Sequence, residues 1–127
     1  LLPVNGDDRY INFEVNPKGV YLSQIGTCRA DRVFIKEMTD LEPVITPMEI
    51  EEDGKKAWGY EIIIPESFVS ALYQTDFRIA EATIKGNFYK CADGAQYPHY
   101  GSHFPVKTEN PDFHRPEFFG EITFRKA

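Results

Sequence analysis

The sequence is poor in the features that define several common protein classes. Its longest apolar run, residues 62–64, is far too short to span a bilayer, which argues against a membrane-spanning helix. Its two cysteines, Cys28 and Cys91, belong to no CxxC or Cys/His cluster of the kind that holds zinc. Two alternatives remain for them, a single disulfide in an oxidising compartment or two buried thiols.

Positive charge is also scarce. Lys and Arg number 14 against 20 Asp and Glu, which gives a formal net charge of −6 and a pI near 5.0. Such a balance opposes binding to a phosphate backbone, so we expect no nucleic-acid partner and favour neutral or cationic ligands.

Aromatic side chains are abundant instead, with ten Phe and seven Tyr beside one Trp. Large flat rings suit both the pleated surface of a sheet and the apolar face of a sugar. The chain of 127 residues is of a common size for one domain, and 42% of it is hydrophobic. We therefore expect residues 1–127 to form one domain around one core.

Period-two alternation predicts most of the secondary structure. Tyr10–Val15 alternates strictly and, with a turn at residues 16–19, predicts a hairpin over residues 10–24. Residues 44–51 and 56–64 flank Asp53-Gly54, a typical tight hairpin turn. The other predicted elements are a short strand at 33–35, a helix of about two turns at 65–72, a long strand at 77–91 interrupted at Gly86, and a last strand at 118–125. Together they predict an all-β antiparallel β-sandwich with one short helix.

Residues 92–117 break every periodicity and contain all three histidines. An ordered loop of this length in a small domain is often functional, although an aromatic, proline-rich loop can also simply cover the end of a sandwich. Rings stand here beside Asn, Lys and Arg side chains, the combination that sugar recognition needs.

Catalytic and metal sites are less well supported by the same segment. His99 and His103 stand at i and i+4, but neighbouring prolines argue against the helix that would bring them to one face. Cys91, Asp93 and His99 supply the residue types of a thiol triad without the surroundings such sites carry. A glycosidase needs two carboxylates across a cleft, whereas the acidic residues here fall mostly on strand faces and turns.

The single tryptophan has two interpretations. Trp58 shares a strand face with Tyr60 and Ile62, which favours burial in the core. If it lies at the mouth of the strand, it is a stacking platform for a ligand.

Several motifs, in order along nearly the whole chain, resemble those of the family 9-like carbohydrate-binding modules. The most specific is Pro111–Gly120, PDFHRPEFFG. The others are Tyr10–Asn16 (YINFEVN), Gly26 with Arg29 and Arg32, Trp58 ahead of Ile64-Pro65, Gly86–Cys91 (GNFYKC) and Pro98–Tyr100 (PHY).

The resemblance implies a jelly-roll or DOMON-like β-sandwich that binds a poly- or oligosaccharide and catalyses nothing itself. It further implies a bacterial module of a polysaccharide-degrading system in an extracytoplasmic location: periplasmic, cell-surface or secreted. Family members usually have further strands ahead of the segment similar to Tyr10–Val15, so we expect the chain to begin inside the domain. Family 9 modules can hold structural calcium, but Asp7-Asp8 lacks the DxDxDG spacing and no ligand set matches. The family also tends to place Trp where His103 stands, which weakens stacking there.

We therefore predict a carbohydrate site with four stacking side chains and four hydrogen-bond donors. The stacking residues are Trp58, Tyr89, Tyr100 and His103, and the donors are Arg29, Lys90, His99 and Arg115. Two alternatives from other classes stay open. One is a glycoside-acting hydrolase fragment that uses the histidine loop, His114 above all; the other is a haem- or metal-binding DOMON-type domain with Met38, Met48 and the histidines as ligands.

Overall fold

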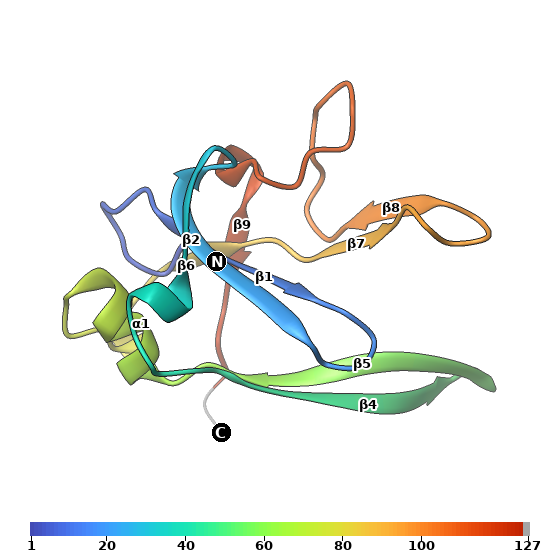
Figure 1. The fold of residues 1–127 in the computed structure, drawn as a ribbon, viewed down its shortest axis with the longest axis horizontal. Coiled ribbons are helices and arrows are strands. Elements are labelled where there is room, and N and C mark those ends of the chain that lie inside the picture. Colours follow the sequence, from blue (N-terminus) through green and yellow to red (C-terminus); the bar gives the residue numbers. More distant parts are fainter. Residues whose placement is uncertain (126–127) are drawn as a thin grey trace.

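The protein is an all-β fold of antiparallel strands with one short α-helix, as the sequence predicts (Figure 1). The computed structural model describes residues 1–125. The strands are β1 (Tyr10–Val15), β2 (Tyr21–Cys28), β3 (Asp31–Phe34), β4 (Val44–Glu52), β5 (Lys55–Ile63), β6 (Ile84–Gly86), β7 (Tyr89–Ala92), β8 (His99–Ser102) and β9 (Gly120–Ile122). The helix α1 spans Glu66–Tyr73, and 3₁₀ turns span Ile35–Glu37 (η1), Ile79–Glu81 (η2) and Pro116–Phe118 (η3).

The N-terminal residues join two separate strand groups into one continuous sheet. Strands β1, β2 and β3 pair in that order, and β6 pairs with β9. Leu1 exchanges backbone hydrogen bonds with Ile11 of β1, while Leu2 exchanges them with Lys85 of β6. Successive residues of an extended chain bond to opposite sides, so residues 1–2 lie between β1 and β6.

The core lies on one face of this sheet, under α1. Ile11 and Ile25 are cross-strand partners, so their side chains leave the sheet together. Phe68 and Leu72 stand one helical turn apart on α1 and pack onto them in one buried cluster. The periodicity predicted this helix at residues 65–72, and the structure confirms it with a shift of one residue.

The other face of the sheet carries Tyr10, which alternates with Ile11 and is equally buried. Its ring meets Phe119 edge-on at 5.8 Å, and its hydroxyl lies 3.1 Å from Nδ1 of His114. Tyr10 therefore holds the segment 112–119, which follows β8 in the chain, against the sheet.

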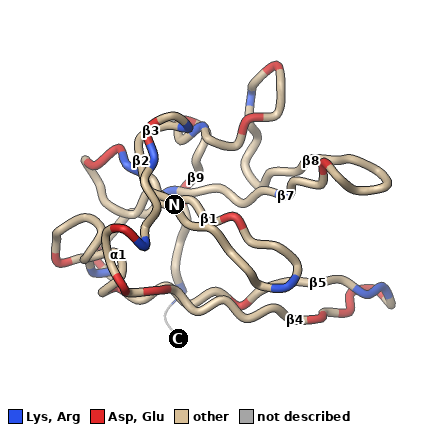
Figure 2. Tube along the Cα trace, in the orientation of Figure 1, with Lys and Arg blue, Asp and Glu red and all other residues tan. Residues whose placement is uncertain are grey.

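The β4–β5 hairpin confirms the turn predicted from Asp-Gly. Asp53 and Gly54 both have positive φ, 51° and 71°, as a tight two-residue hairpin turn requires. At the tip, Glu51 and Glu52 face Lys56 and Lys55 across the ladder, and Figure 2 shows the acidic stretch beside the basic one at the end of the hairpin. Opposite charges on facing strands stabilise the pairing and keep the tip solvated.

The predicted long strand at 77–91 is wrong. Only β6 and β7 form, because side chains bind backbone N–H groups on either side of β6. The carboxylate of Glu66 accepts the N–H of Ile79 at 2.8 Å beside η2, and Oδ1 of Asn87 accepts the N–H of Phe88 at 2.9 Å. Backbone groups held in this way cannot join a strand ladder.

Two further predictions near the C-terminus need correction. The last strand was predicted at 118–125 but spans only Gly120–Ile122, since its partner β6 is three residues long and the ladder ends with it. Residues 92–117 were predicted to be irregular, yet they contain β8, which pairs with all of β7.

The cysteines fit neither alternative drawn from the sequence. Cys28 ends β2 and Cys91 lies on β7, and both thiols are free and exposed. The predicted disulfide and the predicted burial are both wrong, because each cysteine falls on an outward-facing strand position.

Candidate functional site

The β7–β8 hairpin sorts the predicted site residues onto two opposite faces. Its register pairs Tyr89 with Ser102, Lys90 with Gly101, Cys91 with Tyr100 and Ala92 with His99. Directly paired residues project to the same side of a ladder, and neighbours along a strand project to opposite sides. We call the side of Lys90, Ala92, His99 and Gly101 the Lys90 face, and the side of Tyr89, Cys91, Tyr100 and Ser102 the Tyr100 face.

The Lys90 face meets Trp58 of β5. The Lys90 Nζ lies 5.7 Å from the centroid of the Trp58 ring, within cation–π range. Trp58 leans on Tyr60, with 5.5 Å between ring centroids, and remains 47% exposed. The core interpretation of Trp58 is therefore wrong, and the ring has the exposure that a stacking platform requires.

Gly101 leaves open backbone beside Lys90. A Cβ added to Gly101 would meet only the Lys90 Cβ, at 4.0 Å. His99 lies two residues before Gly101 and His103 two residues after it, so their side chains lie on the same face and both are exposed. The floor at Gly101 thus lies between two imidazoles and a lysine.

His103 continues the pairing of the hairpin beyond β8. Its N–H donates to the carbonyl of Phe88 at 2.9 Å, and its ring meets the exposed Phe88 ring edge-on at 6.1 Å. His99 is oriented from the other end, because its Nδ1 lies 2.9 Å from the carbonyl oxygen of Tyr97. We call Trp58, Phe88, Lys90, His99, Gly101 and His103 the Trp58 platform.

The Tyr100 face is built around Phe113. The rings of Tyr89 and Phe113 stack at 4.3 Å with 13° between their planes, and Tyr100 meets Phe113 edge-on at 6.2 Å. Tyr89, predicted as a stacking residue, therefore has one ring face covered, whereas Tyr100 is 49% exposed.

A pocket of about 280 Å³ opens beside Tyr100 and Phe113. Its wall consists of Tyr100, Gly101 and Ser102 from β8 together with Val106, Thr108, Glu109, Pro111, Asp112 and Phe113 from the following loop. Aromatic rings and hydroxyl and carboxylate groups thus converge on one concavity, the usual composition of a small-molecule site.

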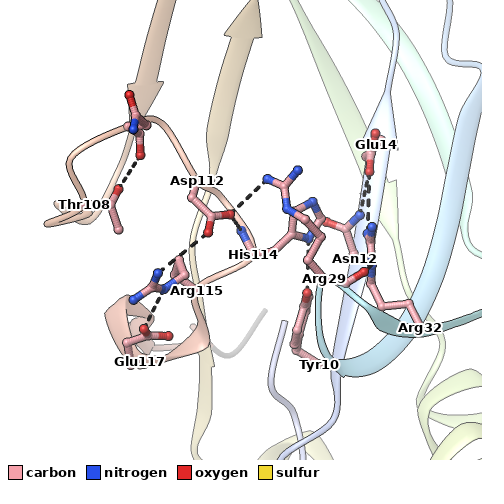
Figure 3. A network of polar contacts seen from close by, with 11 residues as sticks. Tyr10, Asn12, Glu14, Arg29, Arg32, Thr108, Asp112, His114, Arg115 and Glu117 are labelled. Atoms are coloured by element: carbon pink, nitrogen blue, oxygen red, sulfur yellow. Dashed lines mark hydrogen bonds and ion pairs between the residues drawn. The ribbon is translucent and has the colours of Figure 1, made fainter.

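Asp112 holds the far wall of that pocket in an ionic network (Figure 3). Its Oδ1 accepts from Arg29 at 3.0 Å and from the backbone N–H of His114 at 3.1 Å, and Arg115 lies 3.8 Å from Oδ2. Burial raises the pKa of Asp112, but the His114 N–H and the Arg29 guanidinium outweigh it, so the pKa lies below the ordinary value.

The predicted donors Arg29 and Arg115 are thus engaged within the protein. Arg29 pairs with Asp112, and Arg115 donates to Glu117 at 2.6 Å as well as facing Asp112. Both guanidinium groups face Asp112, which lines the pocket. The eight predicted residues therefore form two groups, Trp58, Lys90, His99 and His103 in one and Tyr89, Tyr100, Arg29 and Arg115 in the other.

His114 is a structural group in this arrangement. It is half-buried against Tyr10, and burial first, then Arg32 and Arg29, lowers its pKa. A neutral imidazole held by a buried tyrosine suits packing.

Structural calcium does not fit the acidic residues that the sequence offered. Both carboxylate oxygens of Asp7 engage the Arg9 guanidinium, the shortest contact being 2.6 Å. Over residues 1–125, no group of three or more His, Cys, Asp or Glu side chains is arranged to hold a metal ion.

Phe88, Gly101 and Phe113 line the two sites but were not among the predicted site residues. Phe113 lies in the PDFHRP motif, which was itself a signal. Gly101 has a histidine two residues before it and another two residues after it, a spacing that places all three on one face of a strand. Ser102 on β8 and Glu109 in the following loop carry no comparable signal, because serine and glutamate are common at any surface position.

Fold and site together define a β-sandwich binding module with exposed rings and fixed polar groups. The family model of carbohydrate-binding family 9 matches residues 1–124, and the chain belongs to that family. This confirms the resemblance seen in the motifs.

A solved structure supports the same assignment. It is that of a proposed carbohydrate-binding protein from Bacteroides uniformis, 34% identical, with a TM-score of 0.63. The match covers 95% of this chain and 57% of that one, so the present chain spans little more than half of its length. No curated protein matches the chain. Within residues 1–125, no helix is long and apolar enough to cross a bilayer.

Proposed function

We propose that this chain is a non-catalytic module that binds a poly- or oligosaccharide on the Trp58 platform. One observation carries the proposal: an exposed indole has a lysine ammonium over its ring, and the backbone at Gly101, beside that lysine, is open. The apolar face of a sugar ring stacks on an indole, and its hydroxyls need donors held at fixed positions around it. Lys90, His99 and His103 are such donors.

The platform is exposed and shallow, which suits a chain lying across it more than a buried single unit. Lys90 and the two histidines contact sugar hydroxyls at the rim, where water competes for the same hydrogen bonds. We therefore expect the polar contacts to contribute little to the binding free energy and Trp58 to contribute most of it. Membership of family 9 supports binding without catalysis, a role in a polysaccharide-degrading system and an extracytoplasmic location.

The test is calorimetric titration with a panel of neutral plant oligosaccharides. Trp58→Ala is expected to weaken binding about 30-fold, since a central aromatic contributes about 2 kcal/mol or more. Phe34→Ala is the matched control, because Phe34 also carries a lysine over its ring, with Lys36 Nζ at 5.6 Å, but on β3. Absence of heat from every sugar, or equal losses in the two variants, would refute the platform.

Catalysis is tested separately with chromogenic glycosides. We expect no hydrolysis by the purified protein. Hydrolysis that disappears in His114→Ala would instead establish the hydrolase alternative.

A further inference from the structure

The pocket beside Tyr100 is separate from the Trp58 platform. Tyr100 and Ser102 alternate with His99 and Gly101 along β8, so the pocket and the platform lie on opposite faces of one hairpin. A ligand seated against Phe113 does not reach Trp58 through the ladder between them. The two sites share the backbone of Gly101, but an occupant of the pocket contacts side chains on the opposite face from those of the platform.

Hydrogen bonds fix the loop that forms one wall of the pocket at three points. Asn87 clamps the backbone of Phe104 at the start of the loop, with both bonds at 2.9 Å. The Thr108 hydroxyl donates to the carbonyl of Asn110 at 2.7 Å within the loop, and Asp112 is tied to Arg29 at its end. A concavity held in this way requires little ordering when a ligand enters.

Phe113 itself is fixed by its neighbours. Tyr89 covers one face of its ring and Tyr100 packs on its edge, so the ring forms a rigid apolar wall. The hydrogen bond to Asp93 raises the pKa of the Tyr100 hydroxyl, so this hydroxyl is directed to Asp93 and Tyr100 contributes its ring to the pocket's rim.

The polar groups of the pocket suit hydroxyls. Glu109 is an exposed carboxylate, Ser102 offers a hydroxyl, and Asp112 presents a carboxylate whose charge Arg29 and Arg115 offset. Glu109 repels an anionic ligand, and the overall charge of −6 acts in the same direction. A volume of about 280 Å³ lies just below the range of small-molecule sites, which leaves room for one ring and not for a chain.

We infer that this pocket is a second saccharide site, which takes a single neutral sugar unit with its apolar face on Phe113 and Tyr100. This second site is additional to the Trp58 platform, because it binds a separate sugar unit on the opposite side of the β7–β8 hairpin. A module with two such sites contacts two sugar units that need not belong to one chain.

Amide NMR with the intact protein tests the pocket directly. Neutral monosaccharides at millimolar concentration are expected to shift the backbone amides of Ser102, Thr108 and Glu109. The indole N–H of Trp58 reports the platform in the same spectra, so failure of the platform and failure of the pocket are distinguishable. Pocket amides that stay unmoved with every neutral sugar would overturn the inference.

Two variants separate the sites. Ser102→Trp fills the pocket and is expected to abolish the pocket shifts while the Trp58 indole still responds; Trp58→Ala is expected to do the reverse. Pocket shifts that survive in folded Ser102→Trp would contradict the assignment.

A charge reversal covers the case in which Ser102→Trp fails to fold. Glu109→Lys, at an exposed loop position, is expected to allow the anion glucuronate to bind in the pocket and shift its amides. In the wild type, Glu109 repels glucuronate and we expect no such shift. Glu121→Lys on β9 is the control with the same change of net charge. Equal responses of the two variants to glucuronate, or a wild-type pocket that answers only to an amino sugar, would overturn the inference.

Discussion

The ammonium of Lys90 on β7 lies 5.7 Å from the ring of Trp58 on β5, although the two strands belong to different hairpins. This contact joins the β4–β5 hairpin to the β7–β8 hairpin. The flexible stem of the lysine makes it possible, because it can carry the charge across a gap that the strands themselves do not close. The pair thereby offers a ring and a donor to the same ligand.

Removal of the Lys90 charge tests this role. We expect Lys90→Gln to weaken oligosaccharide binding by about tenfold, because a hydrogen bond to a charged group contributes about 1.5–3 kcal/mol. Stability is expected to change little, since the side chain is exposed. Calorimetric titration and chemical denaturation measure the two quantities. Lys36→Gln, which removes the corresponding ammonium over Phe34, is the control, and a loss of affinity there would contradict the prediction.

The floor at Gly101 allows a second test. Gly101→Leu is expected to block the platform without unfolding the protein, because its Cβ meets only the Lys90 Cβ at 4.0 Å. Gly26→Ala marks the opposite case, since its Cβ would lie 1.6 Å from the carbonyl oxygen of Asp31. We expect normal thermal unfolding with lost sugar binding for the first, and little folded protein for the second. Full affinity in Gly101→Leu would place the ligand elsewhere.

Much of the fold is predictable because short-range chemistry decides it. The strict alternation of Tyr10–Val15 and the Asp53-Gly54 turn specify two hairpins locally, and α1 is specified by Pro65 and its apolar spacing. These signals need no knowledge of distant residues.

The remainder depends on contacts between segments distant in sequence. Strand β8 exists because β7 pairs with it, and its composition, HYGS, has no strand signature of its own. The predicted site residues were individually plausible, but only the register reveals that Lys90 and Tyr100 face opposite ways. Arg29 was predicted as a ligand donor, yet Asp112, 83 positions away, occupies its guanidinium.

Cys91 provides a test of the Tyr100 face. Its thiol donates to Oδ1 of Asp93 at 2.9 Å, and this hydrogen bond, with the carboxylate charge, raises the pKa of Cys91. Asp93→Asn is therefore expected to lower that pKa and speed alkylation by iodoacetamide near neutral pH. The measurement uses a Cys28→Ser background, with Asp8→Asn as the control. An unchanged rate in Asp93→Asn would show that the carboxylate does not govern the thiol.

The core under α1 gives a stability prediction. Phe68 is 0% exposed among Ile11, Ile25 and Leu72, so Phe68→Ala is expected to cost about 3–5 kcal/mol in the free energy of unfolding. Phe34→Ala removes the same ring from a half-open position and is expected to cost far less. Urea denaturation of both variants measures the difference, and equal costs would contradict the packing described for α1.

His114 links the stability of the protein to pH. Its pKa is lowered from 6.5 in the folded protein, first by burial and then by Arg32 and Arg29, so below pH 6.5 the unfolded chain binds more protons than the folded one. Its contribution is therefore fully present above pH 6.5 and is lost as the pH falls through the lower, folded-state pKa. Denaturation midpoints across roughly pH 5 to 8, the range in which histidines titrate, are expected to decline on the acid side.

His114→Gln removes the titrating group while retaining a partner for the Tyr10 hydroxyl, and it is expected to flatten this decline. His99→Gln changes an exposed imidazole of the platform and is the matched control. Asp112, whose pKa is also lowered, loses its contribution only at pH values near its ordinary 3.8 and below, so the two effects occupy different pH windows. A decline that persists unchanged in His114→Gln would mean that another group drives it and that the Tyr10–His114 contact does not hold segment 112–119 to the sheet.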